Sequence, residues 1–202
     1  MEFTLISNPC KFAFDLWLNP MKTSEAKYFL ALLPKEPLAS DIFQIKKEIS
    51  AKFNTKGALK SPAHLTLHMP FLWKERNEQR LIQLLVRATK YSPFNLFLDG
   101  FGAFPPRTIY IKNKESAKLR TFHKEFISYT KQNLKLLNTT HNRGFHPHIT
   151  VAFRDLKKEA FDAAWPVYQQ KTYEAKMLVD SFWLLKHDGR QWHPFHEFPF
   201  VD

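Results

Sequence analysis

The chain is organised around the segment HPHITVAFR, residues 146–154, because its middle repeats an earlier segment, AHLTLH, residues 63–68. Both segments contain a histidine, an aliphatic residue, a threonine and a second aliphatic residue. With 9 His and 12 Thr among 202 residues, this four-residue pattern should arise by chance roughly 0.02 times in such a chain. Two chance copies are therefore not expected. The alternative, two buried histidines in ordinary strands, remains open at this stage.

On a β-strand, side chains alternate between the two faces, so each copy predicts one polar face and one aliphatic face. The polar positions are His64, Thr66 and His68 in the first copy, and His146, His148 and Thr150 in the second. The opposite positions are Leu65 and Leu67, and then Ile149, Val151 and Phe153. Each strand is therefore expected to bury its aliphatic face in a core and to present imidazole and hydroxyl groups on the other face.

These residues resemble the two-histidine phosphoesterases, a family that includes 2'-5' RNA ligase-like proteins and RNA 2',3'-cyclic phosphodiesterases. The family's two His-x-Thr-x tetrads are matched by residues 64–67 and 148–151, and Pro147 stands directly before the second histidine, as is usual there. The segment FPPRTIYI, residues 104–111, resembles the strand-turn-strand between the tetrads. The resemblance covers roughly residues 27 to 187, with the tetrads as its specific part.

The chain departs from the family's pattern at two places. Many members carry an arginine two places before the second histidine, where this chain has His146, and another five places after it, where this chain has Phe153 and Arg154 is displaced by one. Phosphate-binding roles taken from those members are therefore in question here.

The predicted elements alternate between strands and helices. Strands are predicted at 27–33, 94–104, 107–112, 172–186 and 191–200 as well as at the tetrads, and helices at 40–57, 75–90, 115–137 and 155–165, the last capped by Asp155. In the first helix Ile42, Ile45, Ile49 and Phe53 form the apolar stripe, and Lys46, Lys47 and Lys52 are expected on the exposed side. In the third, Leu119, Phe122, Phe126, Thr130 and Leu134 form the stripe.

This order predicts an α+β fold, with two similar lobes of antiparallel sheet covered by helices. The family resemblance implies the same: a bilobal, pseudo-twofold fold with a central cleft to which each lobe supplies one tetrad. Residues 21–202 are expected to form this single domain. Residues 1–20 are interpreted as an extension of uncertain status, because Met21 is a second candidate start.

Composition indicates a globular, basic protein, and because its basic residues are spread along the chain an ordinary solvated surface would also account for most of them. Hydrophobic residues make up 44% of the chain and charged residues 24%, and the net charge is +11, which favours partners that carry phosphates. The single cysteine, Cys10, excludes an internal disulfide and is compatible with a reducing compartment. We expect a cytoplasmic monomer with no membrane segment.

Two imidazoles with pKa values of about 6.5 can act near neutrality as one base and one acid, which suits in-line displacement at phosphorus. We therefore predict His64 and His148 as the acid–base pair and Thr66 and Thr150 as hydroxyl donors to phosphate oxygens. Neither a metal nor a cofactor is required. The resemblance implies an RNA end or nucleotide with a 2',3'-cyclic phosphate as substrate, opened to a 2'-phosphate, with 2'-5' ligation in reverse. The spacing does not say which histidine is the base.

Weaker candidates for substrate binding are His68, His146, Arg154 and Tyr110. Tyr110, Phe71 and Trp73 could stack a base, but aromatic residues are 15% of the chain, which favours core packing for them. Three other classes of function remain open. His141, His146 and His148 could ligate a metal, although the spacing is weak. The protein could be a non-catalytic RNA-binding module, or it could act on a small nucleotide such as an ADP-ribose cyclic phosphate.

Overall fold

The computed structural model describes residues 24–138 and 144–201. These residues form an eight-stranded sheet in the order β6-β3-β4-β5-β2-β1-β7-β8, in which neighbouring strands are antiparallel. The strands are β1 (Glu25–Leu32), β2 (Leu65–Lys74), β3 (Phe94–Phe104), β4 (Thr108–Asn113), β5 (His148–Ala152), β6 (Glu174–Val179), β7 (Ser181–His187) and β8 (Trp192–Pro199). The α-helices are α2 (Leu38–Phe53), α3 (Glu78–Val86), α4 (Ala117–Leu134) and α5 (Lys158–Gln169), with 3₁₀ turns η1 (Gly57–Lys60) and η2 (Glu75–Asn77).

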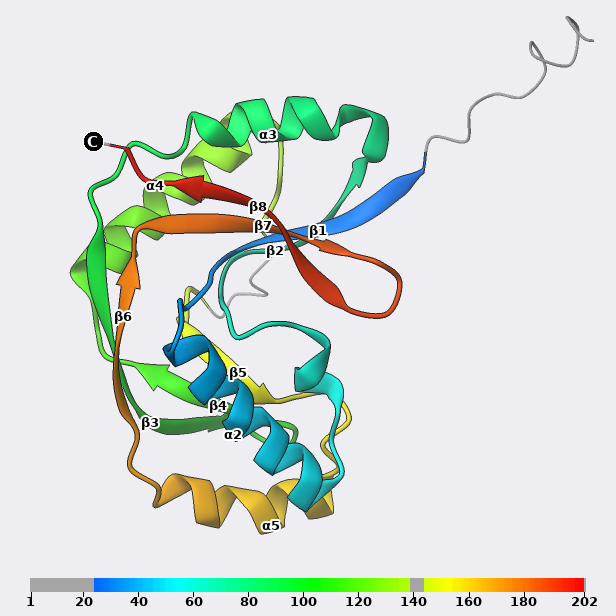
Figure 1. Ribbon diagram of the computed structural model, residues 1–202, viewed down its shortest axis with the longest axis vertical. Coiled ribbons are helices and arrows are strands. Elements are labelled where there is room, and N and C mark those ends of the chain that lie inside the picture. The colour runs from blue at the N-terminus through cyan, green and yellow to red at the C-terminus, as the bar shows by residue number, and fades with distance from the viewer. Residues whose placement is uncertain (1–23, 139–143, 202) are drawn as a thin grey trace, which may run out of the picture.

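The sheet divides at its middle into two similar halves, which confirms the predicted α+β bilobal architecture. One half holds β2, β1, β7 and β8 with helices α3 and α4, and the other holds β5, β4, β3 and β6 with helices α2 and α5. Figure 1 shows α3 and α4 at one end of the molecule and α5 at the other, with the strands between them. The halves are not successive stretches of chain: α2 follows β1 directly but packs against β5.

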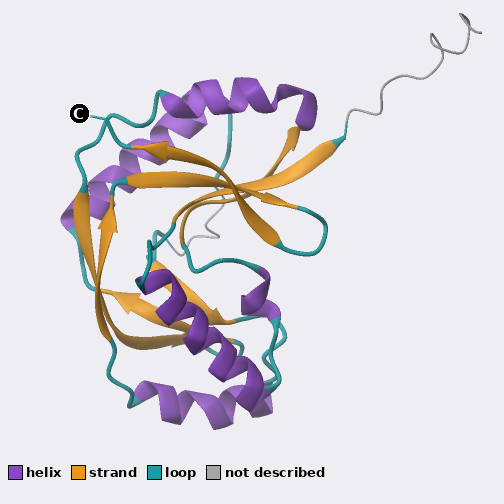
Figure 2. Cartoon of the chain, in the orientation of Figure 1, coloured by secondary structure: helices purple, strands orange, loops and turns teal. Residues whose placement is uncertain are grey.

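Figure 2 shows the helices in purple against the strands in orange. The main core is a single cluster of buried side chains that includes residues of both halves and of their helices. The predicted stripe of α4 is buried there in full, and the Ser116 hydroxyl caps that helix by accepting a hydrogen bond from the Leu119 amide at 3.2 Å. Strand β1 is buried on both faces. Tyr28, Leu30 and Leu32 join the main core, while Phe29 and Ala31 form a second, smaller cluster with Leu185 on the opposite face. That opposite face is the one that carries the tetrad hydroxyls.

Several predicted element boundaries are wrong. Helix α3 is shorter than predicted, because residues 75–77 form the 3₁₀ turn η2 and the helix ends at Val86. A bend at Asp180 divides the predicted strand 172–186 into β6 and β7. Helix α5 starts at Lys158, and it continues past Pro166 to Gln169. Pro166 is exposed, so water can hydrate the carbonyl that loses its helical partner there.

Residues 1–20, with the proposed start at Met21, lie outside the described residues. Among residues 24–138 and 144–201, no helix has the length and hydrophobicity that a membrane crossing requires.

Candidate active site

The two tetrads meet where the halves of the sheet join. Leu65 of β2 pairs with Ile149 of β5, and both side chains are fully buried in the main core. Because the pairing is antiparallel, the neighbouring positions place His64 across from Thr150 and Thr66 across from His148, on the opposite face. Each histidine therefore has one hydroxyl two residues along its own chain and another across the junction. The histidine and threonine side chains are half-buried.

Both imidazoles are held in the same way. The Nδ1 of His64 donates to the Pro62 carbonyl at 2.8 Å, and the Nδ1 of His148 donates to the His146 carbonyl at 2.6 Å. A carbonyl can only accept a hydrogen bond, so each ring carries its proton on Nδ1 when it is neutral. The Nε2 atoms of both rings are left for a ligand.

Burial lowers the pKa of both histidines. The pKa of His64 falls to about 4, first because of burial, then because of the Lys46 charge and, to a smaller extent, the His148 charge. Burial also lowers the pKa of His148, and the charge of His146 adds to that shift. The electrostatic coupling of His64 to His148 means that the two rings lie close enough to influence each other's protonation.

Aromatic side chains surround the second histidine. The ring centroid of His148 lies 4.8 Å from Tyr110 and 5.2 Å from Phe104, and the exposed His146 ring lies 5.1 Å from Phe104. Tyr110 can lie flat across β3 because Gly102 is opposite it, where any Cβ would come within 2.5 Å of the Tyr110 ring. The structure thus brings the predicted Tyr110 and His146 together with His148.

Besides Phe104, three residues near the histidines were not predicted as site residues. Phe29 packs on His64 with ring centroids 4.9 Å apart, and Trp192 packs edge-on against Phe29 at 4.6 Å. Lys112 is paired with His148 across β4 and β5 and is exposed on the same face. Their sequence positions carry no motif, and only the strand pairing reveals them.

The prediction that Lys46 is exposed is wrong. Its side chain is 1% exposed, among the most buried in the protein. A signal for this was present, because Lys46 lies four residues after Ile42 and three before Ile49, within the apolar stripe of the helix.

The prediction that His68 shares the polar face with Thr66 is also wrong. Thr66 pairs with Ala31, but a register shift follows, and His68 pairs with the next residue back, Leu30, which belongs to the main core. Such a bulge reverses the alternation, here as far as a second register shift that precedes Phe71. His68 is 1% exposed, and its Nδ1 donates to the Met69 carbonyl at 2.7 Å.

The two aromatic candidates beyond this bulge also lie away from the tetrads. Phe71 packs against His68 and Tyr28 on the core side, and the Trp73 indole donates to the Asn77 carbonyl at 3.0 Å. Both side chains pack against the main core. The structure therefore does not bring them to the histidines, and it confirms core packing, the alternative to base stacking for these two residues.

Arg154 lies just past the end of β5, in a tight turn. Its backbone has a φ of 64°, and the Asp155 amide donates to the Phe153 carbonyl at 2.9 Å. The guanidinium lies over the exposed Phe153 ring, 5.1 Å from its centroid. The turn directs Asp155 back to residues 55–57, where it accepts hydrogen bonds from the Thr55 hydroxyl and two backbone amides. Asp155 therefore holds this loop. The prediction that Asp155 caps α5 is wrong.

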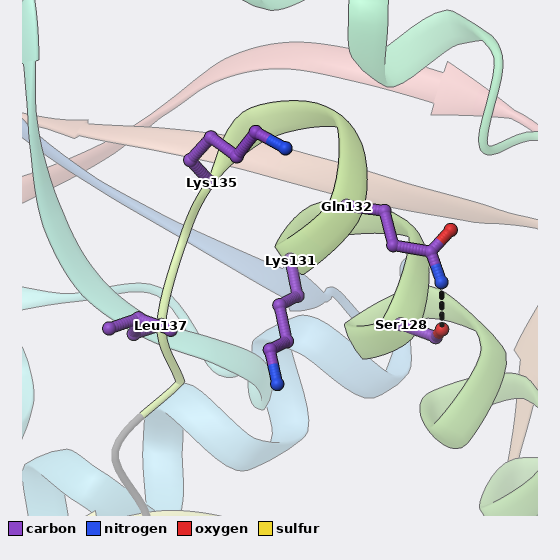
Figure 3. Close-up of a pocket in the computed structure, with 5 residues that line it drawn as sticks. All are labelled: Ser128, Lys131, Gln132, Lys135 and Leu137. Carbon is purple, nitrogen blue, oxygen red and sulfur yellow. Dashed lines mark hydrogen bonds between the residues drawn. The ribbon is translucent and has the colours of Figure 1, made fainter.

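A surface hollow at the C-terminal end of α4 is separate from the tetrads (Figure 3). It is lined by Ser128, Lys131, Gln132, Lys135 and Leu137, and the Gln132 amide donates to the Ser128 hydroxyl at 3.1 Å. Within the described part of the chain, no three His, Cys, Asp or Glu side chains are grouped as metal ligands would be. His141, which the metal alternative needs, lies outside the described residues.

Comparisons with solved structures agree with this fold. The chain resembles Escherichia coli LigT in complex with 3'-AMP, with a TM-score of 0.65 and 19% identity over 89% of this chain and 100% of that one. It also resembles the protein TT0787 of Thermus thermophilus, with a TM-score of 0.60 and 18% identity over 86% and 97% of the two chains. It also resembles a structure described as a phosphoesterase, with a TM-score of 0.63 and 20% identity over 89% of this chain and 100% of that one. At these identities the likeness establishes the fold.

The family itself is established by sequence. No curated protein sequence matches the chain significantly, but the model of the 2'-5' RNA ligase superfamily matches residues 34–191, which include both tetrads and the strands that join them. The chain therefore belongs to the 2'-5' RNA ligase superfamily, whose activities of phosphoester cleavage and ligation fit a site built from two opposed histidines.

Proposed function

We propose that the protein is a phosphodiesterase that opens 2',3'-cyclic phosphates, at RNA ends or on nucleotides, to 2'-phosphates without a metal ion. One observation carries the proposal: the junction between Leu65 and Ile149 brings together two histidines whose Nδ1 atoms are both occupied by backbone carbonyls. Two such rings offer two Nε2 atoms to one phosphate. One can accept a proton while the other donates one.

The reaction needs no further reactant than water. The water oxygen attacks phosphorus as one imidazole removes its proton, the bond from phosphorus to the ribose O3' breaks, and the second imidazole protonates O3'. The product is a 2'-phosphate with a free 3'-hydroxyl. With a 5'-hydroxyl of RNA in place of water as the attacking group, the same two proton transfers and the same loss of O3' form a 2'-5' phosphodiester. The reverse of that step cleaves the 2'-5' bond and restores the cyclic phosphate.

The hydroxyls and the basic surface support this chemistry. Thr66 and Thr150 lie two residues beyond the histidines on the same face, where they can donate to the non-bridging phosphate oxygens. Lys112, paired with His148, adds a positive charge on that face, and the net charge of +11 favours an anionic substrate. One chain supplies both tetrads, so a monomer is sufficient for the reaction. The lone Cys10 is compatible with a reducing compartment such as the cytoplasm.

Small nucleotides belong in the same test as RNA. The LigT structures include complexes with 3'-AMP, NADP+ and ATP, which are all ligands the size of one or two nucleotides. In our protein, the half-buried Phe104 lies beside His148, with ring centroids 5.2 Å apart, where a single base could stack. An ADP-ribose cyclic phosphate is therefore the second candidate substrate.

The decisive experiment is product analysis on a panel of cyclic-phosphate mononucleotides, oligonucleotides of increasing length and ADP-ribose cyclic phosphate, with and without EDTA. We expect 2'-phosphate products, equal rates after chelation, and loss of turnover in His64→Gln and His148→Gln. Abolition by EDTA, restored by a divalent metal, would refute the metal-free reaction. Tight RNA binding that is unchanged in both variants, with no turnover of any substrate, would establish a non-catalytic binding module instead.

A further inference from the structure

Lys46 is a buried cation bonded entirely to backbone carbonyls. Its Nζ donates to the carbonyl oxygens of Ala58, Ser61 and Pro62, each at 3.1 Å. Three acceptors use all three N–H groups of an ammonium. The acceptors come from η1 and the loop that follows it, so one side chain of α2 fixes the segment that leads directly into His64.

This arrangement is costly, which argues that the charge has a use. Burial disfavours an ammonium, and it lowers the pKa of Lys46 to about 8. Carbonyl dipoles offset only part of the lost hydration, whereas a methionine of similar length would fill the same apolar stripe position at no such cost. The lysine is nevertheless charged at neutral pH.

The link to the site is a shared acceptor. The Pro62 carbonyl that accepts from Lys46 Nζ is the same carbonyl that accepts from His64 Nδ1. Lys46 thus sets the position of the oxygen that orients the imidazole, and its charge lies behind the ring, on the side away from Nε2. The other charged or titratable group acting on His64 from a packed element is His148 of β5, while Phe29 of β1 contributes an uncharged ring.

We propose that Lys46 is a positioning residue for His64, and that by holding the Pro62 carbonyl and placing a fixed charge behind the imidazole it makes His64 the proton acceptor and His148 the proton donor. This inference rests on the proposed function for the reaction it directs. The second histidine lacks the same control. Its Nδ1 donates to the His146 carbonyl, and the group whose charge acts on it is the exposed imidazole of His146, where His64 has a buried ammonium held by three carbonyls.

Kinetics against pH test the assignment. The acid limb of kcat/KM reports the base of the free enzyme, so it should lie near the pKa of His64, about 4. In Lys46→Met the charge is gone, and the limb should move up by about one pH unit or more, together with a roughly tenfold fall in kcat/KM at pH 7 from a misplaced ring. Lys46→Arg keeps the charge and should keep the limb low. Lys47→Met, one residue along on the exposed side, should change neither quantity.

A residue that only supported the loop would lower the rate at every pH and leave the limb in place, and that result would overturn the proposal. So would a limb that moves equally in Lys46→Met and Lys46→Arg, or one that moves only when His148 is replaced. In that last case His148 would be the base.

A second measurement does not depend on activity. Histidine-selective NMR, assigned with His64→Gln, should show His64 as the Nδ1–H tautomer with a low titration point that rises in Lys46→Met. In the wild-type protein, the His64 signals should also shift near pH 8 as Lys46 loses its charge. This wild-type test applies even if the methionine variant does not fold. If no substrate is turned over but these shifts occur, the proposed function fails and the control of His64 by Lys46 stands. If turnover occurs and His64 is insensitive to Lys46, the inference fails alone.

Discussion

Leu65 pairs with Ile149 at the boundary between the two halves of the sheet, and neither side chain is exposed to solvent. The residues on either side of this pair are the two catalytic candidates and their hydroxyl partners. A pair of aliphatic residues in the core thereby fixes the relative position of two histidines that lie far apart in the sequence. The opposed arrangement is a consequence of strand pairing, and the chemistry depends on it.

Removing either imidazole should nearly abolish turnover. We expect His64→Gln and His148→Gln each to lower kcat/KM for a cyclic phosphate by about 10² to 10⁴-fold, because each variant removes one of two proton transfers. The double variant should have a kcat/KM only slightly below that of the less active single variant, since the two groups act as a unit. His193→Gln, on the exposed β7–β8 hairpin, is the control and should retain full activity. A loss that is simply multiplicative in the double variant would contradict a concerted pair.

The tetrad hydroxyls should contribute less than the imidazoles. Thr66→Val and Thr150→Val keep the side-chain shape and remove a donor to the phosphate oxygens, so we expect kcat to fall by roughly 10 to 100-fold. KM should change little if the hydrogen bond strengthens in the transition state. Steady-state kinetics of both variants measure this directly. A change in KM alone would show that the hydroxyls bind the ground state and the transition state equally.

The pH profile of kcat/KM should be bell-shaped and displaced to acid pH. Activity should rise as His64 loses its proton, near pH 4, and should fall as His148 loses its proton, at a pH below the ordinary value of 6.5. In the profile of kcat both limbs should lie at higher pH, because bound phosphate favours the protonated form of each ring. A profile that rises monotonically to alkaline pH would be incompatible with paired acid–base roles.

The sequence predicted those parts of the fold and site that depend on local periodicity. The α4 stripe and the alternation within residues 64–67 and 148–151 are set by residues a few positions apart, and the structure has them as predicted. Phe153, predicted on the buried face, lies past the end of β5 and is 41% exposed, so that prediction is wrong. His68 was misplaced because a bulge reverses strand alternation, and a bulge depends on how β2 pairs with β1. No count of residues along β2 alone could reveal that shift.

Lys46 and Asp155 were misassigned for a related reason. Each was read from its local chemistry, as a charged residue for the surface and as a helix cap. The actual partners of Asp155 lie about 100 residues away, at positions 55–57, and those of Lys46 in a loop beyond the end of its helix. A polar group can be buried when a distant segment supplies its hydrogen-bond partners. Local sequence patterns do not identify such partners.

Acid should destabilise the fold through the core histidines. The pKa of His123 is lowered to about 4, chiefly by burial, with its Nε2 donating to the Leu67 carbonyl at 3.1 Å. Since the unfolded chain binds this proton at about pH 6.5, stability should fall as the pH drops from 6.5 and level off below 4, a loss of about 3 kcal/mol from this group. His123→Phe, which keeps the stacking on Phe145, should remove one proton from the pH dependence of the free energy of unfolding. Urea unfolding at several pH values measures this dependence. If its slope is the same in the variant and in the wild-type protein, His123 is not held neutral in the fold.

The loop at residues 55–57, which precedes the first tetrad, should depend for its stability on the carboxylate of Asp155, which follows the second tetrad. Asp155 accepts from the Thr55 hydroxyl at 2.6 Å and from the backbone amides of Lys56 and Gly57 at 2.7 and 2.9 Å. Burial opposes ionisation, but these bonds together hold the pKa of Asp155 below its usual range. Their contribution to stability is therefore present above about pH 4 and lost at lower pH. We expect Asp155→Ala to lower the free energy of unfolding by roughly 2 to 4 kcal/mol.

The same contact explains why residue 57 is a glycine. A Cβ there would come within 2.4 Å of the Phe153 carbonyl oxygen and 2.7 Å of an Asp155 carboxylate oxygen. Gly57→Ala should therefore force the two segments apart and lower the free energy of unfolding by about 1 to 3 kcal/mol. The double variant with Asp155→Ala should lose less than the sum of the two single losses, because Asp155→Ala removes one of the groups with which the new Cβ clashes. Asp162→Ala, which breaks only the exposed ion pair with Lys158, should cost under about 1 kcal/mol. Chemical denaturation of the four variants tests this, and strict additivity of Gly57→Ala and Asp155→Ala would show that the segments are not coupled through this contact.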